Sequence, residues 1–107
     1  MELNVVWSTF SQNEYLKALA YVHDEFGLKA ARELQTSVDL WIQRIAQNPD
    51  ISAPEVFLKN ETRQYRSKIV GKHNKLVYWY DSTTVYISDF WDMRRDPSKM
   101  SKRVTKK

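Results

Sequence analysis

Cysteine is absent from the 107-residue chain, and glycine and proline are scarce, at two and three residues. The missing cysteines exclude a disulfide scaffold, a thiolate zinc site and a thiol nucleophile. Two glycines are too few for a glycine-rich phosphate-binding loop. No stretch approaches the roughly 18–20 apolar residues that a membrane span needs, and the start Met-Glu-Leu-Asn does not look like a secretory signal. We therefore expect a small cytoplasmic domain without a membrane partner.

What is present is an ordinary globular composition with an uneven charge. Hydrophobic residues make up 42% and charged residues 28% of a chain long enough for one domain. The net charge of +4 divides into −4 for residues 1–58, +5 for 59–75, −3 for 76–93 and +6 for 94–107. If the fold joins the two basic blocks, they form a cationic surface that attracts phosphates. The alternative is a solvated strand face and a disordered basic tail.

The first half of the chain predicts a strand followed by two helices. The segment from Leu3 to Trp7 is apolar and rich in β-branched residues, which is typical of a strand. Ser11 and Glu14 match a capping box at a helix start. Apolar residues with helical spacing then form one face of each helix: Tyr15, Leu19, Val22 and Phe26, and then Leu28, Ala31, Leu34, Val38, Trp41, Ile42 and Ile45. Gly27 separates the two helices and Pro49 ends the second, so we expect an antiparallel helical hairpin.

The second half predicts three strands after a loop over residues 49–63. Residues 64–70, 75–81 and 85–91 have the composition of strands, and short turns connect them as an antiparallel meander. The expected fold class is α+β in the order β-α-α-β-β-β, an antiparallel sheet with the helical hairpin on one face. The other face should be partly open, because no further element is predicted to cover it.

The end of the chain is expected to be a tail. Residues 98–107 are basic and lack a clear helical period, so we predict disorder without a partner. The domain itself should span residues 1–97.

Most ordinary catalytic centres find no support in the sequence. His23 and His73 have no paired ligand spacing, and no nucleophile-elbow sequence surrounds a serine. We therefore expect no metal and no cofactor. Asp89 and Asp92 could act as paired carboxylates, but pairing with the neighbouring Arg94 and Arg95 is the more common role for such residues.

A set of basic residues could converge on one exposed face or rim of the meander. These residues are Arg66, Lys68, Lys75, Arg94 and Arg95. Such a cluster could bind an acidic partner, or stabilise the charge that develops when a ribose 2′-hydroxyl attacks its neighbouring phosphate. Cleavage also needs groups that transfer protons, for which the candidates are Tyr65, Tyr78, Tyr80, Tyr86 and His73. We expect Tyr78 to lie in the core instead.

These motifs together resemble a known family. The element order, the stretch 65–70, the strand that begins Lys75-Leu76-Val77-Tyr78 and the ending over residues 90–97 are similar to the RelE/ParE superfamily, the toxins of type II toxin–antitoxin or plasmid stabilisation modules. The resemblance covers about residues 3–97. It implies a growth inhibitor held inactive by a cognate antitoxin.

The resemblance allows two modes of action, of which the first, cleavage of mRNA, is our leading hypothesis and the second is the alternative. RelE-like members are metal-independent, ribosome-dependent endoribonucleases that cut mRNA, and ParE-like members inhibit DNA gyrase without cutting RNA. In the first case the resemblance implies a catalytic role for five residues: Arg66, Lys68, Lys75, Arg94 and Arg95. However, no Tyr or His follows Asp96, where RelE-like enzymes keep an acid/base residue. A third hypothesis is a binding module that uses a cationic sheet face.

Overall fold

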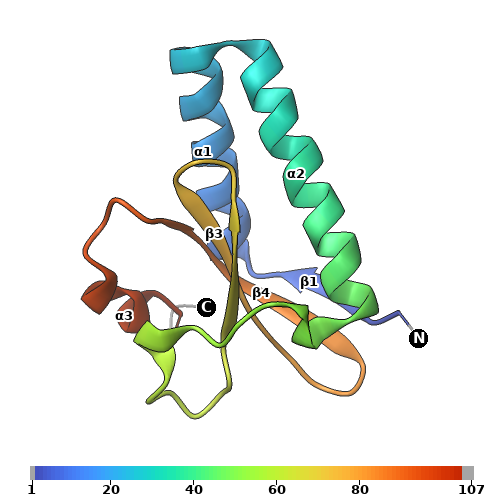
Figure 1. Ribbon diagram of the computed structural model, residues 1–107. Helices are drawn as coiled ribbons and strands as arrows, with labels where there is room; N and C mark the ends of the chain where they lie inside the picture. Colours follow the sequence, from blue (N-terminus) through green and yellow to red (C-terminus); the bar gives the residue numbers. More distant parts are fainter. Residues whose placement is uncertain (1, 105–107) are drawn as a thin grey trace.

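The structure is a computed structural model that describes residues 2–104. A four-stranded sheet carries a long helical hairpin on one face and short elements on the other. The elements follow in the order β1 (Asn4–Trp7), α1 (Thr9–Phe26), α2 (Leu28–Gln47), η1 (Pro49–Ile51), η2 (Val56–Leu58), β2 (Arg66–Val70), β3 (Asn74–Tyr80), β4 (Thr84–Asp92), η3 (Pro97–Lys99) and α3 (Met100–Val104). Figure 1 shows the hairpin and α3 on different sides of the sheet.

The sheet has the strand order β1-β4-β3-β2. The predicted meander is confirmed, since β2 pairs with β3 and β3 with β4 in antiparallel fashion. β1 is parallel to β4, which makes the complete sheet mixed. Both helices and the strands β2 and β3 lie between β1 and β4 in the chain, which provides the long connection that parallel neighbours need.

The first helix starts earlier than expected, and the capping-box prediction is wrong. Ser8 is the N-cap, and its side-chain oxygen accepts a hydrogen bond from the Ser11 amide at 3.0 Å. The buried Ser11 hydroxyl donates to the Ile87 carbonyl of β4 at 2.9 Å. Ser11 and Glu14 therefore make tertiary contacts rather than a cap. The predicted end of the helix is confirmed at Gly27, whose φ of 95° favours glycine.

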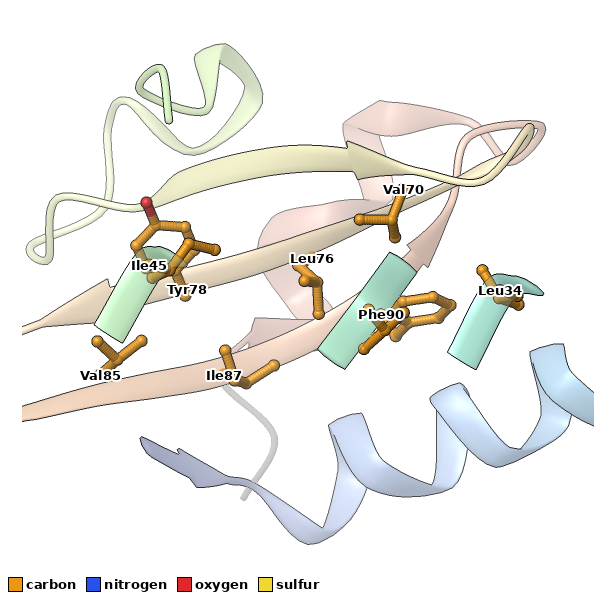
Figure 2. Packing of buried hydrophobic residues seen from close by; sticks show 9 residues of the cluster. Leu34, Ile45, Val70, Leu76, Tyr78, Val85, Ile87 and Phe90 are labelled. Carbon is orange, nitrogen blue, oxygen red and sulfur yellow. The ribbon is translucent and has the colours of Figure 1, made fainter. Parts of the chain in front are cut away.

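The main core lies between the hairpin and the sheet. Figure 2 shows its buried side chains, which include Leu34 and Ile45 of α2 and Val70, Leu76, Tyr78, Val85, Ile87 and Phe90 of the sheet. The predicted helical faces largely supply this core. Phe26 and Leu28 are exceptions, at 62% and 54% exposed. They lie at the tip of the hairpin, where each helix still has apolar residues at helical spacing but these residues do not pack into the core.

The far face of the sheet is also covered, contrary to the sequence expectation. A second core joins Leu58 of η2, Tyr65 just before β2, Val77 and Trp91 of the sheet, and Met100 and Val104 of α3. The predicted disorder of residues 98–107 is therefore wrong for residues 98–104, and the last three residues lie outside the described part. The apolar pair at spacing four, Met100 and Val104, gives this short helix its buried side.

Shortening Met100 should test whether the end of the chain is part of the folded domain. Met100 is fully buried, so Met100→Ala leaves a cavity and should lower the free energy of unfolding by about 2–5 kcal/mol. Urea unfolding followed by far-UV circular dichroism measures the change. Lys99→Ala, an exposed neighbour, is the control and should stay within about 0.5 kcal/mol of the parent. Equal midpoints for both variants would contradict the second core.

Candidate functional site

Two of the five predicted site residues, Arg66 and Lys68, face the helical hairpin. They lie opposite Tyr78 and Leu76 of the hairpin-side core, and directly paired residues of antiparallel strands share a face. The Lys68 ammonium lies 4.0 Å from the ring centroid of Trp41 on α2. The Arg66 guanidinium donates to the Ser52 carbonyl at 2.6 Å and forms an ion pair with Asp50 at 3.4 Å. Both cations are thus engaged within the chain.

Lys75 lies on the opposite face of the sheet, in an ion pair with Glu55. Glu55 is only 2% exposed, and it also accepts hydrogen bonds from the Ser67 hydroxyl at 2.8 Å and the Phe57 amide at 3.0 Å. Burial by itself would raise the pKa of Glu55. The Lys75 ammonium and the hydrogen bonds outweigh burial and hold this pKa below its usual value of 4.5. The sequence analysis missed Glu55, because nothing in the loop pattern places it beneath Lys75.

Arg94 and Arg95 lie beyond the end of β4, near the hairpin. The Arg94 guanidinium makes two hydrogen bonds to the Asp92 carboxylate, at 2.8 and 3.0 Å, and lies 5.1 Å from the ring centroid of Tyr21. The hydrogen bonds from Arg94 outweigh partial burial and lower the pKa of Asp92. The predicted pairing of Asp92 with a neighbouring arginine is therefore confirmed.

The expected convergence of the five cations into one site is wrong. The alternation of side chains along a strand puts Arg66 and Lys68 on one face of the sheet and Lys75 on the other. Arg94 and Arg95 line a cavity elsewhere. The sequence of a strand shows that its side chains alternate between two faces. It does not show which of its charged side chains form ion pairs with residues of other elements. The catalytic role of each residue stays a prediction.

The cavity has a volume of about 460 Å³ and lies between the inner face of the hairpin and the turn that joins β2 to β3. It brings Arg94 and Arg95 together with Lys72 and His73 of that turn. The Met93 amide donates to the His73 carbonyl at 2.7 Å, which holds the turn against the segment after β4. Gly71, with φ of 65°, permits the turn to close.

Among the predicted proton-transfer groups, the tyrosines are engaged elsewhere. Tyr78 is in the core as expected, and its hydroxyl donates to the Pro49 carbonyl at 2.7 Å. The Tyr80 hydroxyl donates to Asp50, and that hydrogen bond raises the pKa of Tyr80. Tyr65 is buried, and Tyr86 stacks on Trp79 with 4.3 Å between the ring centroids. His73 is the exposed candidate, and its side chain has no hydrogen-bond partner within residues 2–104.

A buried charge network centred on Arg103 escaped the sequence analysis. Arg103 forms two hydrogen bonds to Asp89, at 2.8 and 3.0 Å, and one to Glu14 at 2.8 Å. Asp89 is fully buried. Its partner is Arg103, and not the neighbouring Arg94 or Arg95 that the sequence suggested. Its role is to satisfy a buried charge. The only signal in the sequence was the pair Met100 and Val104, which brings Arg103 to the sheet.

The described residues include no group of three His, Asp or Glu side chains placed to hold a metal ion. Within residues 2–104, no helix is long and apolar enough to cross a membrane.

Comparison with known proteins identifies the fold. No family model matches the chain, and no curated protein matches its sequence. One similar solved structure is a chain of the chromosomal ParDE TA system from P. aeruginosa, with a TM-score of 0.67 and 8% identity over 85% of this chain and 96% of that one. Another is the YoeB dimer from Staphylococcus aureus, with a TM-score of 0.59 and 20% identity over 84% of this chain and 95% of that one. The chain has the ParE/YoeB fold. This confirms the fold class expected from the resemblance.

Replacing Lys75 should reverse the pH dependence of stability that Glu55 contributes. In the parent protein the pKa of Glu55 is lowered, so its contribution is present above about pH 4.5 and is lost in more acidic solution. In Lys75→Met, burial dominates and the folded-state pKa rises above the unfolded value. The variant should lose about 3–5 kcal/mol of unfolding free energy at pH 7 and regain part of it at pH 5.

Urea unfolding at pH 7 and pH 5 measures this difference. The double variant Lys75→Met/Glu55→Gln is the control and should show no such gain on acidification, because it has no buried carboxyl to protonate. Parallel pH profiles for the parent and Lys75→Met would contradict the pairing.

Proposed function

We propose that this protein is the toxin of a type II toxin–antitoxin module and is held inactive by a cognate antitoxin. The observation that carries the proposal is the extent of the structural similarity, which spans 96% of the ParDE chain and 95% of the YoeB chain. It also covers 85% and 84% of this chain, so the similarity concerns the domain and not one motif. Because one fold can host several activities, the mode of action needs a separate argument.

For the mode of action, we propose inhibition by binding, of the ParE-like kind directed at DNA gyrase. RNA cleavage needs cations and proton-transfer groups around one phosphate. Arg66, Lys68 and Lys75 instead lie on two faces of the sheet and have partners within the chain. A binding surface has no need for such convergence.

RelE-like cleavage of mRNA on the ribosome is the second candidate, and a separate observation favours it. Arg94, Arg95 and His73 line one cavity, which joins two predicted site residues to the exposed proton-transfer candidate. An imidazole and two guanidinium groups could serve the attack of a ribose 2′-hydroxyl on a phosphate. The departure from the RelE-like pattern after Asp96 argues against this candidate.

Producing the chain alone in a bacterial host should arrest growth, and co-producing the antitoxin from the adjacent gene should restore it. The physical reason is that the antitoxin covers the inhibitory surface. Growth curves and viable counts after induction measure the effect. Normal growth with soluble protein whose circular dichroism shows a folded domain would contradict both toxin candidates and favour a binding module.

The purified protein should inhibit supercoiling by DNA gyrase, while messages in arrested cells stay intact. Supercoiling assays and primer extension on messages after induction measure the two effects. His73→Ala and Arg95→Ala change exposed side chains, so both variants should fold. Arg32→Ala, an exposed cation of α2 that does not line the cavity, is a matched control. Codon-phased cuts that disappear in His73→Ala but persist in Arg32→Ala would overturn inhibition by binding in favour of cleavage.

A further inference from the structure

β2 lies at one end of the strand order, so one side of its backbone faces away from β3. The loop before β2 covers the first half of that side. The Ser67 amide donates to the Ala53 carbonyl at 3.1 Å, and the Glu55 amide donates to the Tyr65 carbonyl at 2.9 Å. Since the backbone groups of successive residues point to alternate sides of a strand, those of Ile69 also point away from β3. Within residues 2–104, neither the amide nor the carbonyl of Ile69 has a hydrogen-bond partner.

The open half of this edge is apolar on the face away from the hairpin. The Ile69 side chain is 57% exposed and lies opposite Lys75 on that face. Phe57 of η2 is 50% exposed, and its ring centroid lies 5.9 Å from the Lys75 ammonium. Proteins usually protect an open strand edge that carries an exposed apolar side chain, because such an edge pairs readily with another chain.

The hairpin face of the same edge is cationic. The Lys68 ammonium and the Arg44 guanidinium lie 4.0 and 4.9 Å from the ring centroid of Trp41. Within residues 2–104, neither cation forms an ion pair, whereas Arg66 on the same face is paired with Asp50. Two cations beside one ring repel each other when no anion is present. They therefore favour a partner that supplies carboxylates.

These two faces define the chemistry of a strand that could pair with β2. Side chains along such a strand alternate between the faces of the sheet. The residue opposite Ile69 would lie on the apolar face, and the residue opposite Lys68 would lie on the cationic face. The matching segment is extended and alternates apolar with acidic residues.

Other occupants fit these features less well. A second copy of the chain, paired about Ile69, would bring Lys68 and Arg44 of both copies to one face without adding a carboxylate. A nucleic acid would neutralise the cations, but it has no strand backbone to complete the hydrogen bonds of Ile69. The charge and the open backbone together favour an acidic peptide.

We propose that residues 68–70 form a docking edge for an extended segment of a partner protein in which acidic and apolar residues alternate. Main-chain hydrogen bonds to Ile69 hold the segment as an added strand. Its apolar side chains lie against Ile69 and Phe57, and its carboxylates lie near Lys68 and Arg44. The inference goes beyond the proposed toxin function, since growth arrest does not define which segment of a partner this chain accepts.

Fluorescence anisotropy with labelled seven-residue peptides tests the docking edge. One peptide alternates Glu with Ile or Val and has a central Val, and its control has the same residues in one acidic and one apolar block. The alternating peptide should bind at least about tenfold more tightly, because it alone presents each kind of side chain to the matching face. Its affinity should fall as salt rises, since half of its contacts are ionic.

Methylation of single peptide amides tests the strand pairing itself. The backbone groups of the apolar residues point toward Ile69, so N-methylation of the central Val should weaken binding by about fivefold or more. N-methylation of a neighbouring Glu, whose amide points away from β2, is the control and should change the affinity by less than about twofold.

Two double variants with equal charge change test the cationic face. Lys68→Ala/Arg44→Ala should weaken binding of the alternating peptide by about tenfold or more. Lys29→Ala/Arg32→Ala removes two exposed cations nearer the start of α2 and should change the affinity by less than about twofold.

Removing the outward amide of Ile69 tests the edge from the side of the protein. Ile69→Pro should weaken binding of the alternating peptide while circular dichroism shows a folded domain, because proline is tolerated where an edge amide faces solvent. The methylated peptides provide the same test on the unchanged protein.

Equal affinities for the alternating and the block peptide, equal losses in the two double variants, or equal effects of the two methylations would overturn the proposal. Displacement of the labelled peptide by a single-stranded oligonucleotide of equal charge at lower concentration than by the unlabelled peptide would overturn it in favour of a nucleic acid. A dimer in sedimentation velocity that Ile69→Pro dissociates would overturn it in favour of a second copy. Each of these results in a protein that still arrests growth would leave the proposed toxin function in place.

Discussion

The contact on which the arrangement of the domain depends is the buried charge cluster of Arg103, Asp89 and Glu14. Arg103 comes from the end of the chain, Asp89 from β4 and Glu14 from the first helix. The Arg103 guanidinium lies 4.9 Å from the ring centroids of Phe10 and Trp91. A buried carboxylate without a partner costs several kcal/mol, so Asp89 is tolerated in the core only if α3 docks. The cluster thus makes the end of the chain an obligatory part of the fold.

Docking of α3 covers one face of the sheet and so limits which of its side chains a partner could contact. It fills the face away from the hairpin with apolar side chains, and Lys75 at the margin of that face already neutralises Glu55. On the face toward the hairpin, Arg66 forms an ion pair with Asp50, and the Lys68 ammonium lies over the Trp41 ring. The positive charge of Arg66, Lys68 and Lys75 therefore serves internal contacts. Beside the hairpin cavity, Lys72 and Arg95 form no ion pair within residues 2–104, whereas Arg94 is paired with Asp92.

This division of charge is a feature of the side chains of this chain and does not follow from its fold. The hairpin and the sheet are needed for the shared architecture of the ParDE chain and YoeB, but the side chains at the margins are free to differ. In this chain the margin near the hairpin tip combines exposed aromatic rings with Lys72, His73 and Arg95. Because one fold can host several activities, the activity of such a chain depends on its local side chains and not on its element order.

The sequence by itself determined the β-α-α-β-β-β order, the hairpin turn at Gly27, the meander and the position of Tyr78 in the core, because apolar periodicity and turn residues are local signals. It also indicated the pairing of Asp92 with Arg94, which are two residues apart. Only the tertiary structure decided that Arg66 and Lys75 lie on opposite faces, that Glu55 sits beside Lys75, and that Arg103 joins Asp89 and Glu14. Those contacts join residues that are distant in sequence, and their energies depend on burial, which no local pattern encodes.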